Sequence, residues 1–290
     1  MAKGKSLKIF LMDGVASGRW ICELSNWNGK AYKIPRTEYS KCLNREELRK
    51  PSIYFLFGYS ENDKPRIYIG ETEDAIQRLG EHIKDDKKEF WNEAIIFISK
   101  DDQLNKAHIK YLESRFYDIA KEVDRYKVEN TNQPKKSTIS EAEVCEMEEF
   151  IENVRLIVPT LGYKAFEPLV PKSTCESTTD ETESFYFIEN KNGINATGMA
   201  SPEGFIVLKG SKIFNEAAKS LSKGILRLRE QYISEEIIQE IDGRYTLTND
   251  VLLSSSSTAS SFVLGYSSSG PQTWKNKQGK TLKEVNEEIK

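Results

Sequence analysis

A dense apolar run, SIYFLFGYS, begins at Ser52. Its length and its aromatic and β-branched residues predict a buried strand. After a short polar stretch, RIYIGE at residues 66–71 predicts a second strand, and we expect the two to pair as an antiparallel hairpin. EAIIFISK at residues 93–100 predicts a third strand.

Between these strands the apolar spacing becomes helical. Residues 73–85 predict an amphipathic helix with Thr72 as its N-cap and acidic residues in its first turn. Residues 104–123 predict a long helix and residues 140–158 another. Strands and helices alternating in this way indicate an α/β fold.

The two ends of the chain have different patterns. Residues 6–34 predict short strands, with Asn28-Gly29 as a hairpin signal. Residues 166–183 combine Pro, Ser, Thr and acidic residues without periodicity, which is typical of a linker. Residues 184–290 then resume with strand, turn, strand and helix patterns, which predict a separate small α+β domain.

The serine-rich stretch near residues 252–275 has two interpretations. It is either low-complexity sequence or part of a folded element. We favour a short helix with Ser256 or Ser257 as its N-cap, with Ala259, Phe262 and Val263 on an apolar face, and with its end at Gly265.

Composition narrows the class of protein. The chain has 290 residues, with 38% hydrophobic and 30% charged, which suits one large or two medium soluble domains. No apolar run is long enough for a membrane helix, and the apolar core at the start is too short for a signal peptide. We expect a cytoplasmic protein. Its four cysteines (Cys22, Cys42, Cys145 and Cys175) are scattered and are expected to be reduced thiols, not a disulfide frame or a zinc site.

The net charge of −3 argues by itself against a nucleic-acid partner. The charge is unevenly distributed, however. Residues 137–183 contain 11 acidic and 3 basic side chains, whereas residues 1–50 contain 11 basic and 5 acidic ones. Without the acidic segment the chain is mildly basic, so a local phosphate-binding face is compatible with the sequence.

Candidate chemistry is concentrated on the predicted hairpin and the helix after it. Tyr54 and Tyr68 lie on adjacent strands and can share a face if the register allows. Gly70 would let the chain pass close beneath that face. Arg78 and His82 are four residues apart, so they share one side of the helix.

On the long helix, Glu113 lies between apolar neighbours, where a carboxylate must pair with a cation or bind a metal. Two phenols, an arginine, a histidine and one carboxylate suit metal-assisted phosphodiester hydrolysis. Mg²⁺ accepts one carboxylate and several waters, the arginine can hold the phosphate, and a tyrosine can deprotonate water. Taken singly, each residue has an ordinary structural role. Arg78 could pair with Glu81, for example, and Glu113 with Lys106 or Lys110.

The ordered set resembles the GIY-YIG nuclease family over about residues 50–135. Its motifs are Ser52-Ile53-Tyr54, with Ser where the family has Gly; Tyr68-Ile69-Gly70; Arg78; His82, as in some GIY-YIG restriction enzymes; Glu113; and a late asparagine, for which Asn130 is the first choice and Asn132 the alternative. The resemblance implies an α/β core with a three-stranded antiparallel sheet flanked by helices.

The resemblance also implies cleavage of DNA with one divalent cation, Mg²⁺ or in its place Mn²⁺, bound by Glu113. The implied catalytic residues are Tyr54, Tyr68, Arg78, His82, Glu113 and Asn130. Either tyrosine can be the general base, and His82 could take the proton onward from Tyr54. One such centre cuts one strand, so cleavage of a duplex requires a homodimer or sequential nicking. His108 lies five positions before Glu113 and is expected to be structural.

The C-terminal segment is similar to an uncharacterised domain that is often fused after GIY-YIG nucleases. It also resembles, more weakly, small domains of restriction-modification proteins that are suspected of reading modified DNA. Reading DNA and supporting folding or dimerisation both remain open as its role. An aromatic residue among basic ones suits a nucleic-acid contact, so the candidates are Trp274, Lys275, Lys277 and Lys280, although Trp274 could equally be a core residue.

The expected organisation has five parts: a β-rich N-terminal extension (1–50), the nuclease core (51–136), an acidic helix packing on the core (137–165), a linker (166–183) and an accessory domain (184–290). We expect a metal-dependent DNA endonuclease, in restriction or anti-phage defence, whose C-terminal domain selects the target. The alternatives are a structure-specific repair or mobile-element nuclease and a non-cleaving DNA-binding module. All three predict DNA binding that weakens with salt.

Overall fold

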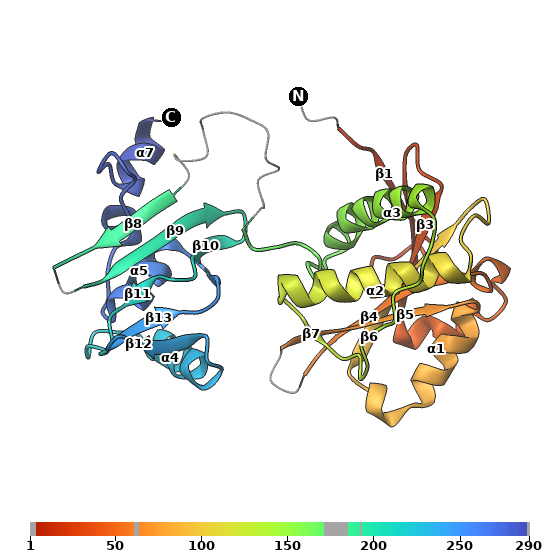
Figure 1. The fold of residues 1–290 in the computed structure, drawn as a ribbon, viewed down its shortest axis with the longest axis horizontal. Helices are drawn as coiled ribbons and strands as arrows, with labels where there is room; N and C mark the ends of the chain where they lie inside the picture. The colour runs from red at the N-terminus through yellow and green to blue at the C-terminus, as the bar shows by residue number, and fades with distance from the viewer. Residues whose placement is uncertain (1–3, 61–63, 171–184, 192, 289–290) are drawn as a thin grey trace. The chain divides into compact units, whose positions relative to one another are not determined.

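The computed structural model describes residues 4–60, 64–170, 185–191 and 193–288. The chain divides into two compact units, residues 1–168 and 169–290. Figure 1 shows both as mixtures of helices and strands, and each is described by itself below. The class is therefore α/β, with one sheet in each unit.

The first unit contains one seven-stranded sheet. Its elements in chain order are β1 (Leu7–Leu11), β2 (Trp20–Leu24), β3 (Gly29–Pro35), the 3₁₀ turns η1 (Arg36–Cys42) and η2 (Glu46–Leu48), β4 (Ser52–Tyr59), β5 (Pro65–Thr72), α1 (Ala75–Lys84), the 3₁₀ turn η3 (Asp86–Lys88), β6 (Trp91–Ser99), α2 (Lys106–Val123), β7 (Lys127–Val128) and α3 (Glu141–Thr160). The strand order is β1-β2-β3-β6-β4-β5-β7. All neighbours are antiparallel except β5 and β7, which are parallel.

The expected three-stranded sheet is part of a larger sheet, which has seven strands, so the predicted number of strands is wrong. The three predicted strands are β6, β4 and β5, which lie side by side at the centre of the sheet. β3 pairs with β6 along its whole length, from Gly29 opposite Ser99 to Pro35 opposite Glu93. The N-terminal strands β1, β2 and β3 therefore belong to the same sheet. By pairing with β6, β3 provides hydrogen-bond partners for backbone groups that would otherwise be exposed at the edge of the sheet.

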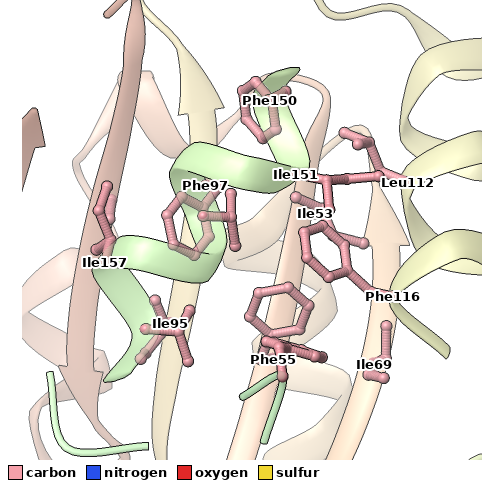
Figure 2. Close-up of a cluster of buried hydrophobic side chains, with 14 of the residues drawn as sticks. Ile53, Phe55, Ile69, Ile95, Phe97, Leu112, Phe116, Phe150, Ile151 and Ile157 are labelled. Atoms are coloured by element: carbon pink, nitrogen blue, oxygen red, sulfur yellow. The ribbon is translucent and has the colours of Figure 1, made fainter. Parts of the chain in front are cut away.

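Both faces of the sheet are covered, and β4 supplies side chains to each. Ile53, Phe55 and Phe57 alternate with Tyr54 and Leu56, and all five are buried. The first three pack in the cluster beneath α2 and α3, part of which Figure 2 shows. Tyr54 and Leu56 pack on the opposite face with the residues of α1. A strand buried on both faces explains the nearly continuous apolar run in the sequence.

A histidine joins α2 to α3. Ser140 and Glu143 form a capping box at the start of α3. The buried His108 contacts a carboxylate oxygen of Glu143 through Nε2 at 3.1 Å and the carbonyl oxygen of Gln103 through Nδ1 at 3.1 Å. Its partners hold the two helices together, which confirms the expectation that His108 is structural.

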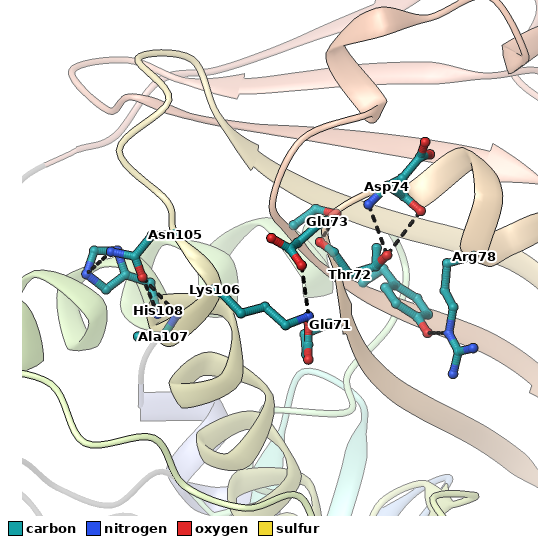
Figure 3. Close-up of polar contacts among 11 residues, drawn as sticks. Glu71, Thr72, Glu73, Asp74, Arg78, Asn105, Lys106, Ala107 and His108 are labelled. Atoms are coloured by element: carbon teal, nitrogen blue, oxygen red, sulfur yellow. Dashed lines mark hydrogen bonds and ion pairs between the residues drawn. The ribbon is translucent and has the colours of Figure 1, made fainter.

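The N-cap of the helix after the hairpin lies two residues later than predicted. Asp74 is the N-cap of α1, and its side chain accepts from the Gln77 backbone N–H at 2.9 Å. Thr72 remains in β5, where its hydroxyl accepts from the Asp74 backbone N–H at 3.1 Å (Figure 3). Thr72 thus supports the turn before the cap.

The second unit also contains a seven-stranded sheet. Its elements are β8 (Phe185–Glu189), β9 (Asn195–Ser201), β10 (Gly204–Val207), β11 (Lys212–Ile213), α4 (Lys223–Ser234), β12 (Ile238–Ile241), β13 (Arg244–Leu247), β14 (Val251–Leu253), α5 (Ser256–Leu264), α6 (Gly270–Thr273) and α7 (Leu282–Glu288). The strand order is β12-β13-β11-β9-β10-β14, with β8 pairing on β9.

The serine-rich stretch is folded, as the helical interpretation predicted. The cap is Ser255, one residue before the expected position, and Gly265 ends α5 at a φ of 75°. The apolar face is confirmed, since Ala259 and Phe262 are fully buried. The remaining serines act as hydrogen-bonding groups: the Ser268 hydroxyl donates to Ser260 at 2.7 Å.

The scattered cysteines and the lengths of the apolar runs predict a soluble protein without disulfides. The described cysteines Cys22, Cys42 and Cys145 are unpaired, while Cys175 and residues 171–183 of the predicted linker lie outside the described residues. Across the described chain, no helix combines the length and the apolar character needed to cross a membrane.

Candidate active site

A pocket of about 410 Å³ opens beside β5 in the first unit, between α1 and α2. Side chains from separate elements line it: Tyr68 on β5, Arg78 and His82 on α1, Lys88 on η3, Glu113 on α2, and Asn130 and Asn132 after β7. The pocket therefore gathers five of the six catalytic residues that the resemblance implies. The sixth, Tyr54, is only 1% exposed and lies behind this wall.

Strand register explains why the two tyrosines meet. Tyr54 stands opposite Gly70, and Leu56 opposite Tyr68, so both phenols lie on the α1 face. Their ring centroids are 6.2 Å apart. A β-carbon at Gly70 would come within 2.5 Å of the Tyr54 ring carbon Cζ. A glycine is thus needed at this position because the phenol of Tyr54 lies across it.

The Tyr54 hydroxyl is held from two sides. Arg78 Nε donates to it at 3.2 Å, and His82 Nε2 lies 2.8 Å away. Figure 3 shows the Arg78 guanidinium reaching from α1 to this hydroxyl. Because arginine can only donate, the hydroxyl hydrogen is free to point to His82, which accepts it in the tautomer protonated on Nδ1. Tyr54, Arg78 and His82 therefore form one hydrogen-bonded group.

Burial sets the protonation states of this group. It raises the pKa of Tyr54 well above its usual value, and the nearby Tyr68 raises it further. It lowers the pKa of His82 to about 4, and the positive charges of Arg78 and Lys88 lower it further. At neutral pH the phenol therefore keeps its proton and the imidazole is uncharged.

Arg78 is also oriented by a carboxylate. Its Nη1 donates to Glu81 Oε2 at 2.7 Å, one turn further along α1. Both side chains are more than one-third exposed, so this ion pair adds little stability but limits the rotamers of the guanidinium. Arg78 can thus present its remaining donors to an anion in the pocket.

Glu113 lies across the pocket without a direct ion pair among the described residues, although the charges of Lys106 and Arg78 act on it from further away. Burial raises the pKa of its carboxyl to about 7, and the nearby carboxylate of Glu71 contributes to the increase. Within the described residues no cation lies at ion-pairing distance from Glu113. Lys106, one of the partners suggested by the sequence, instead reaches Glu71 at 2.7 Å and Glu73 at 3.6 Å (Figure 3).

This donor set fits a cation that stays largely hydrated. Among the described residues there is no group of three or more His, Cys, Asp and Glu that could enclose a metal. Mg²⁺ does not require such a cage, because it keeps several waters and binds through one or two carboxylates together with substrate phosphate. A half-buried carboxylate with a raised pKa and no counter-ion suits that mode of binding, and Glu113 is the residue that would hold the ion.

The two late asparagines lie on the same wall but differ in what they contact. Asn130 donates from Nδ2 to the Ile69 carbonyl at 2.7 Å and accepts from the Ile69 N–H at 3.0 Å. Its side chain therefore continues the pairing of β7 along the edge of β5, between Tyr68 and Gly70. Asn132 is exposed in the pocket wall. Asn130 is a positioning residue for the Tyr68-Ile69-Gly70 motif.

Ser52, the departure from the family motif, occupies a regular strand position. It pairs with Thr72 in the β4–β5 register, and its side chain is fully buried. Its hydroxyl donates to the Thr72 carbonyl at 3.4 Å. The backbone at this position needs no glycine, so serine is accommodated without disturbing Tyr54.

Sequence reasoning missed two residues of this region, Lys88 and Glu71. Lys88 lines the pocket with its ammonium 3.5 Å from the centroid of the Tyr68 ring. Glu71 follows the tyrosine motif directly and influences Glu113. The sequence offered a weak signal for each: Lys88 lies in a run of charged residues, and Glu71 adjoins Gly70.

In the second unit, Trp274 is fully buried and its indole N–H donates to the Ser256 carbonyl at 3.0 Å. Of the two interpretations of Trp274, the core residue is therefore confirmed and the nucleic-acid contact is excluded, because its ring packs against Phe205. Lys275, Lys277 and Lys280 are exposed, and Lys280 pairs with Glu288 at 2.6 Å.

Comparison with known proteins identifies the second unit alone. The family described as "Domain of unknown function (DUF4357)" matches residues 185–286. No curated protein and no solved structure matches the chain. Residues 185–286 are thus similar to the DUF4357 family.

Proposed function

We propose that the first unit is a metal-dependent DNA endonuclease and that the DUF4357 domain selects its target. The observation that carries the proposal is the Tyr54 hydroxyl held between Arg78 and His82, directly behind the wall of a pocket that Glu113 also lines. Domains of the DUF4357 family are often found C-terminal to GIY-YIG nucleases, which supports the same conclusion.

In the proposed reaction, water attacks the phosphorus of a DNA phosphodiester. A new bond forms from the water oxygen to phosphorus, and the bond to one sugar oxygen breaks. Arg78 binds the phosphate and offsets the charge that develops on it. When bound at Glu113, Mg²⁺ would supply charge stabilisation for the phosphate and the leaving oxygen.

The proton of the attacking water leaves through the two phenols. Tyr68 lines the pocket, with its ring centroid 6.2 Å from that of Tyr54, and the Tyr54 hydroxyl contacts His82. Arg78 and Lys88 suppress protonation of His82 before substrate arrives. A bound phosphate offsets the positive charges of Arg78 and Lys88. Substrate binding therefore raises the pKa of His82, so that the imidazole can accept the proton released by the attacking water.

The test is a cleavage assay with Mg²⁺ or Mn²⁺ on plasmid and phage DNA, modified and unmodified, and on flap and junction substrates. We expect cleavage by the wild type and its loss in Arg78→Ala and Glu113→Ala. Preference for modified or unmodified duplex assigns the enzyme to restriction or anti-phage defence, and preference for flaps or junctions assigns it to repair or mobile elements. Salt-sensitive binding without cleavage of any substrate would contradict the nuclease proposal and leave a DNA-binding module.

A further inference from the structure

Lys88 occupies an unusual position in the pocket. It is the last residue of the turn η3, and its half-buried ammonium lies 3.5 Å from the centroid of the Tyr68 ring. The backbone at Lys88 is fixed, because Arg36 Nη1 donates to its carbonyl oxygen at 3.0 Å. The lysine is thus held against the tyrosine that lines the pocket.

Within the described part of the chain, Lys88 makes no direct ion pair, and the carboxylates of Asp85 and Glu129 act on its charge only from a longer distance. No carboxylate of the described residues lies within ion-pairing distance, and its hydrogen-bond acceptor is the Glu129 carbonyl at the long distance of 3.5 Å. Burial accordingly lowers the pKa of Lys88. A cation–π contact offsets part of the lost hydration but provides no counter-ion.

Unlike Lys88, the two neighbouring cations each form a direct ion pair. Arg78 pairs with Glu81 at 2.7 Å, and Lys106 pairs with Glu71 at 2.7 Å. Lys88 therefore has the strongest need for an anion among these three. Arg78 lines the same pocket, together with the carboxylates of Glu81, Asp85 and Glu113, so an anion bound there would lie near two positive charges.

We propose that Lys88 binds a phosphate of the DNA backbone in this pocket, as a second phosphate-binding cation beside Arg78. This inference rests on the proposed function and adds a substrate contact to it. The Tyr68 ring beneath the ammonium fixes its direction, so the phosphate is held next to the phenol that lines the pocket.

The test measures affinity for a short DNA duplex in a Glu113→Gln background, where binding is read without cleavage. Lys88→Met is compared with Lys87→Met and Lys88→Arg. Lys87 is the matched control because it lies on the same turn and is exposed, outside the pocket lining. We expect Lys88→Met to weaken binding about tenfold, Lys88→Arg to retain affinity, and Lys87→Met to change affinity less than about twofold.

Salt dependence supplies a readout that a purely structural role would not change. Loss of one phosphate contact should reduce the slope of log affinity against log salt by about 0.9 for Lys88→Met and leave it unchanged for Lys87→Met. Equal behaviour of the two variants, with wild-type cleavage intact, would overturn the inference and leave the nuclease proposal standing. Absence of both DNA binding and cleavage in the wild type would overturn both.

Discussion

The phenol of Tyr54 lies across Gly70 on the neighbouring strand, where a β-carbon would come within 2.5 Å of the ring carbon Cζ. The ring cannot move away easily, because its hydroxyl is held by Arg78 and His82 and its residue is 1% exposed. The glycine and the tyrosine therefore form one packing unit, and the first prediction follows from this dependence.

Gly70→Ala should destabilise the protein by about 1–3 kcal/mol, because the added methyl group overpacks a rigid site. Chemical denaturation measures the effect. Gly224→Ala is the control, since a β-carbon there meets nothing within 4 Å and α4 should if anything gain stability. Wild-type stability of Gly70→Ala would contradict the described packing.

His82 should make folding stability fall in mild acid. Its pKa is about 4 in the folded protein and 6.5 as its ordinary value, so the unfolded chain binds more protons between these limits. The free energy of unfolding should therefore decrease as pH falls through this window, by up to about 3 kcal/mol. Above pH 6.5 the full contribution is present.

Urea unfolding of wild type and His82→Gln at pH 5 and pH 7 checks this expectation. The relevant quantity is the difference between the two proteins at each pH, because Glu113 titrates in an overlapping range with the opposite sign. The wild type should lose more stability than the variant on acidification. Equal losses would mean that His82 is not held uncharged by burial.

Glu113 should be the residue through which a divalent cation stabilises the protein. Mn²⁺ or Mg²⁺ should raise the thermal midpoint of the wild type and not that of Glu113→Gln. Since the pKa of this carboxyl is about 7, protons compete with the cation, and the shift should be larger at pH 8 than at pH 6. Asp118→Asn is the matched control, because Asp118 is exposed on the same helix. An equal shift in Glu113→Gln would place the cation elsewhere.

Both tyrosines should be needed for cleavage, each for a different reason. Tyr68→Phe removes a hydroxyl from the pocket wall, whereas Tyr54→Phe removes the link to His82 and the acceptor for Arg78. We expect each variant to lose about 10²–10⁴ in single-turnover rate, the usual range for acid–base groups. If only one of the two losses is seen, the proton path through both phenols is wrong and the affected tyrosine is the base.

Much of the central architecture could be predicted from the sequence because local patterns determine it. The hairpin of β4 and β5 follows from apolar runs, and the shared face of Arg78 and His82 follows from helical spacing. The additional strands of the sheet could not be predicted, because pairing of β3 with β6 joins segments some 60 residues apart. Periodicity does not specify long-range partners.

Side-chain environments were the least predictable feature. Trp274 lies among lysines in the sequence and yet is fully buried, because packing between α5 and the second sheet decides its exposure. The sequence around Lys88 is typical of a surface lysine, because it lies in a run of charged residues. Its position is decided by the turn η3, which places its ammonium 3.5 Å from the centroid of the Tyr68 ring. The position of Asn130 in the motif indicates a site residue, but its two hydrogen bonds to Ile69 at the β5 edge depend on strand pairing, which the sequence does not specify.

The most direct test of the central proposal is nicking of supercoiled plasmid in Mg²⁺ by wild type, Glu113→Gln and Asp118→Asn. We predict metal-dependent nicking by wild type and Asp118→Asn and its loss in Glu113→Gln. Nicking that persists in Glu113→Gln at the wild-type rate would contradict the proposal that Glu113 binds the catalytic cation.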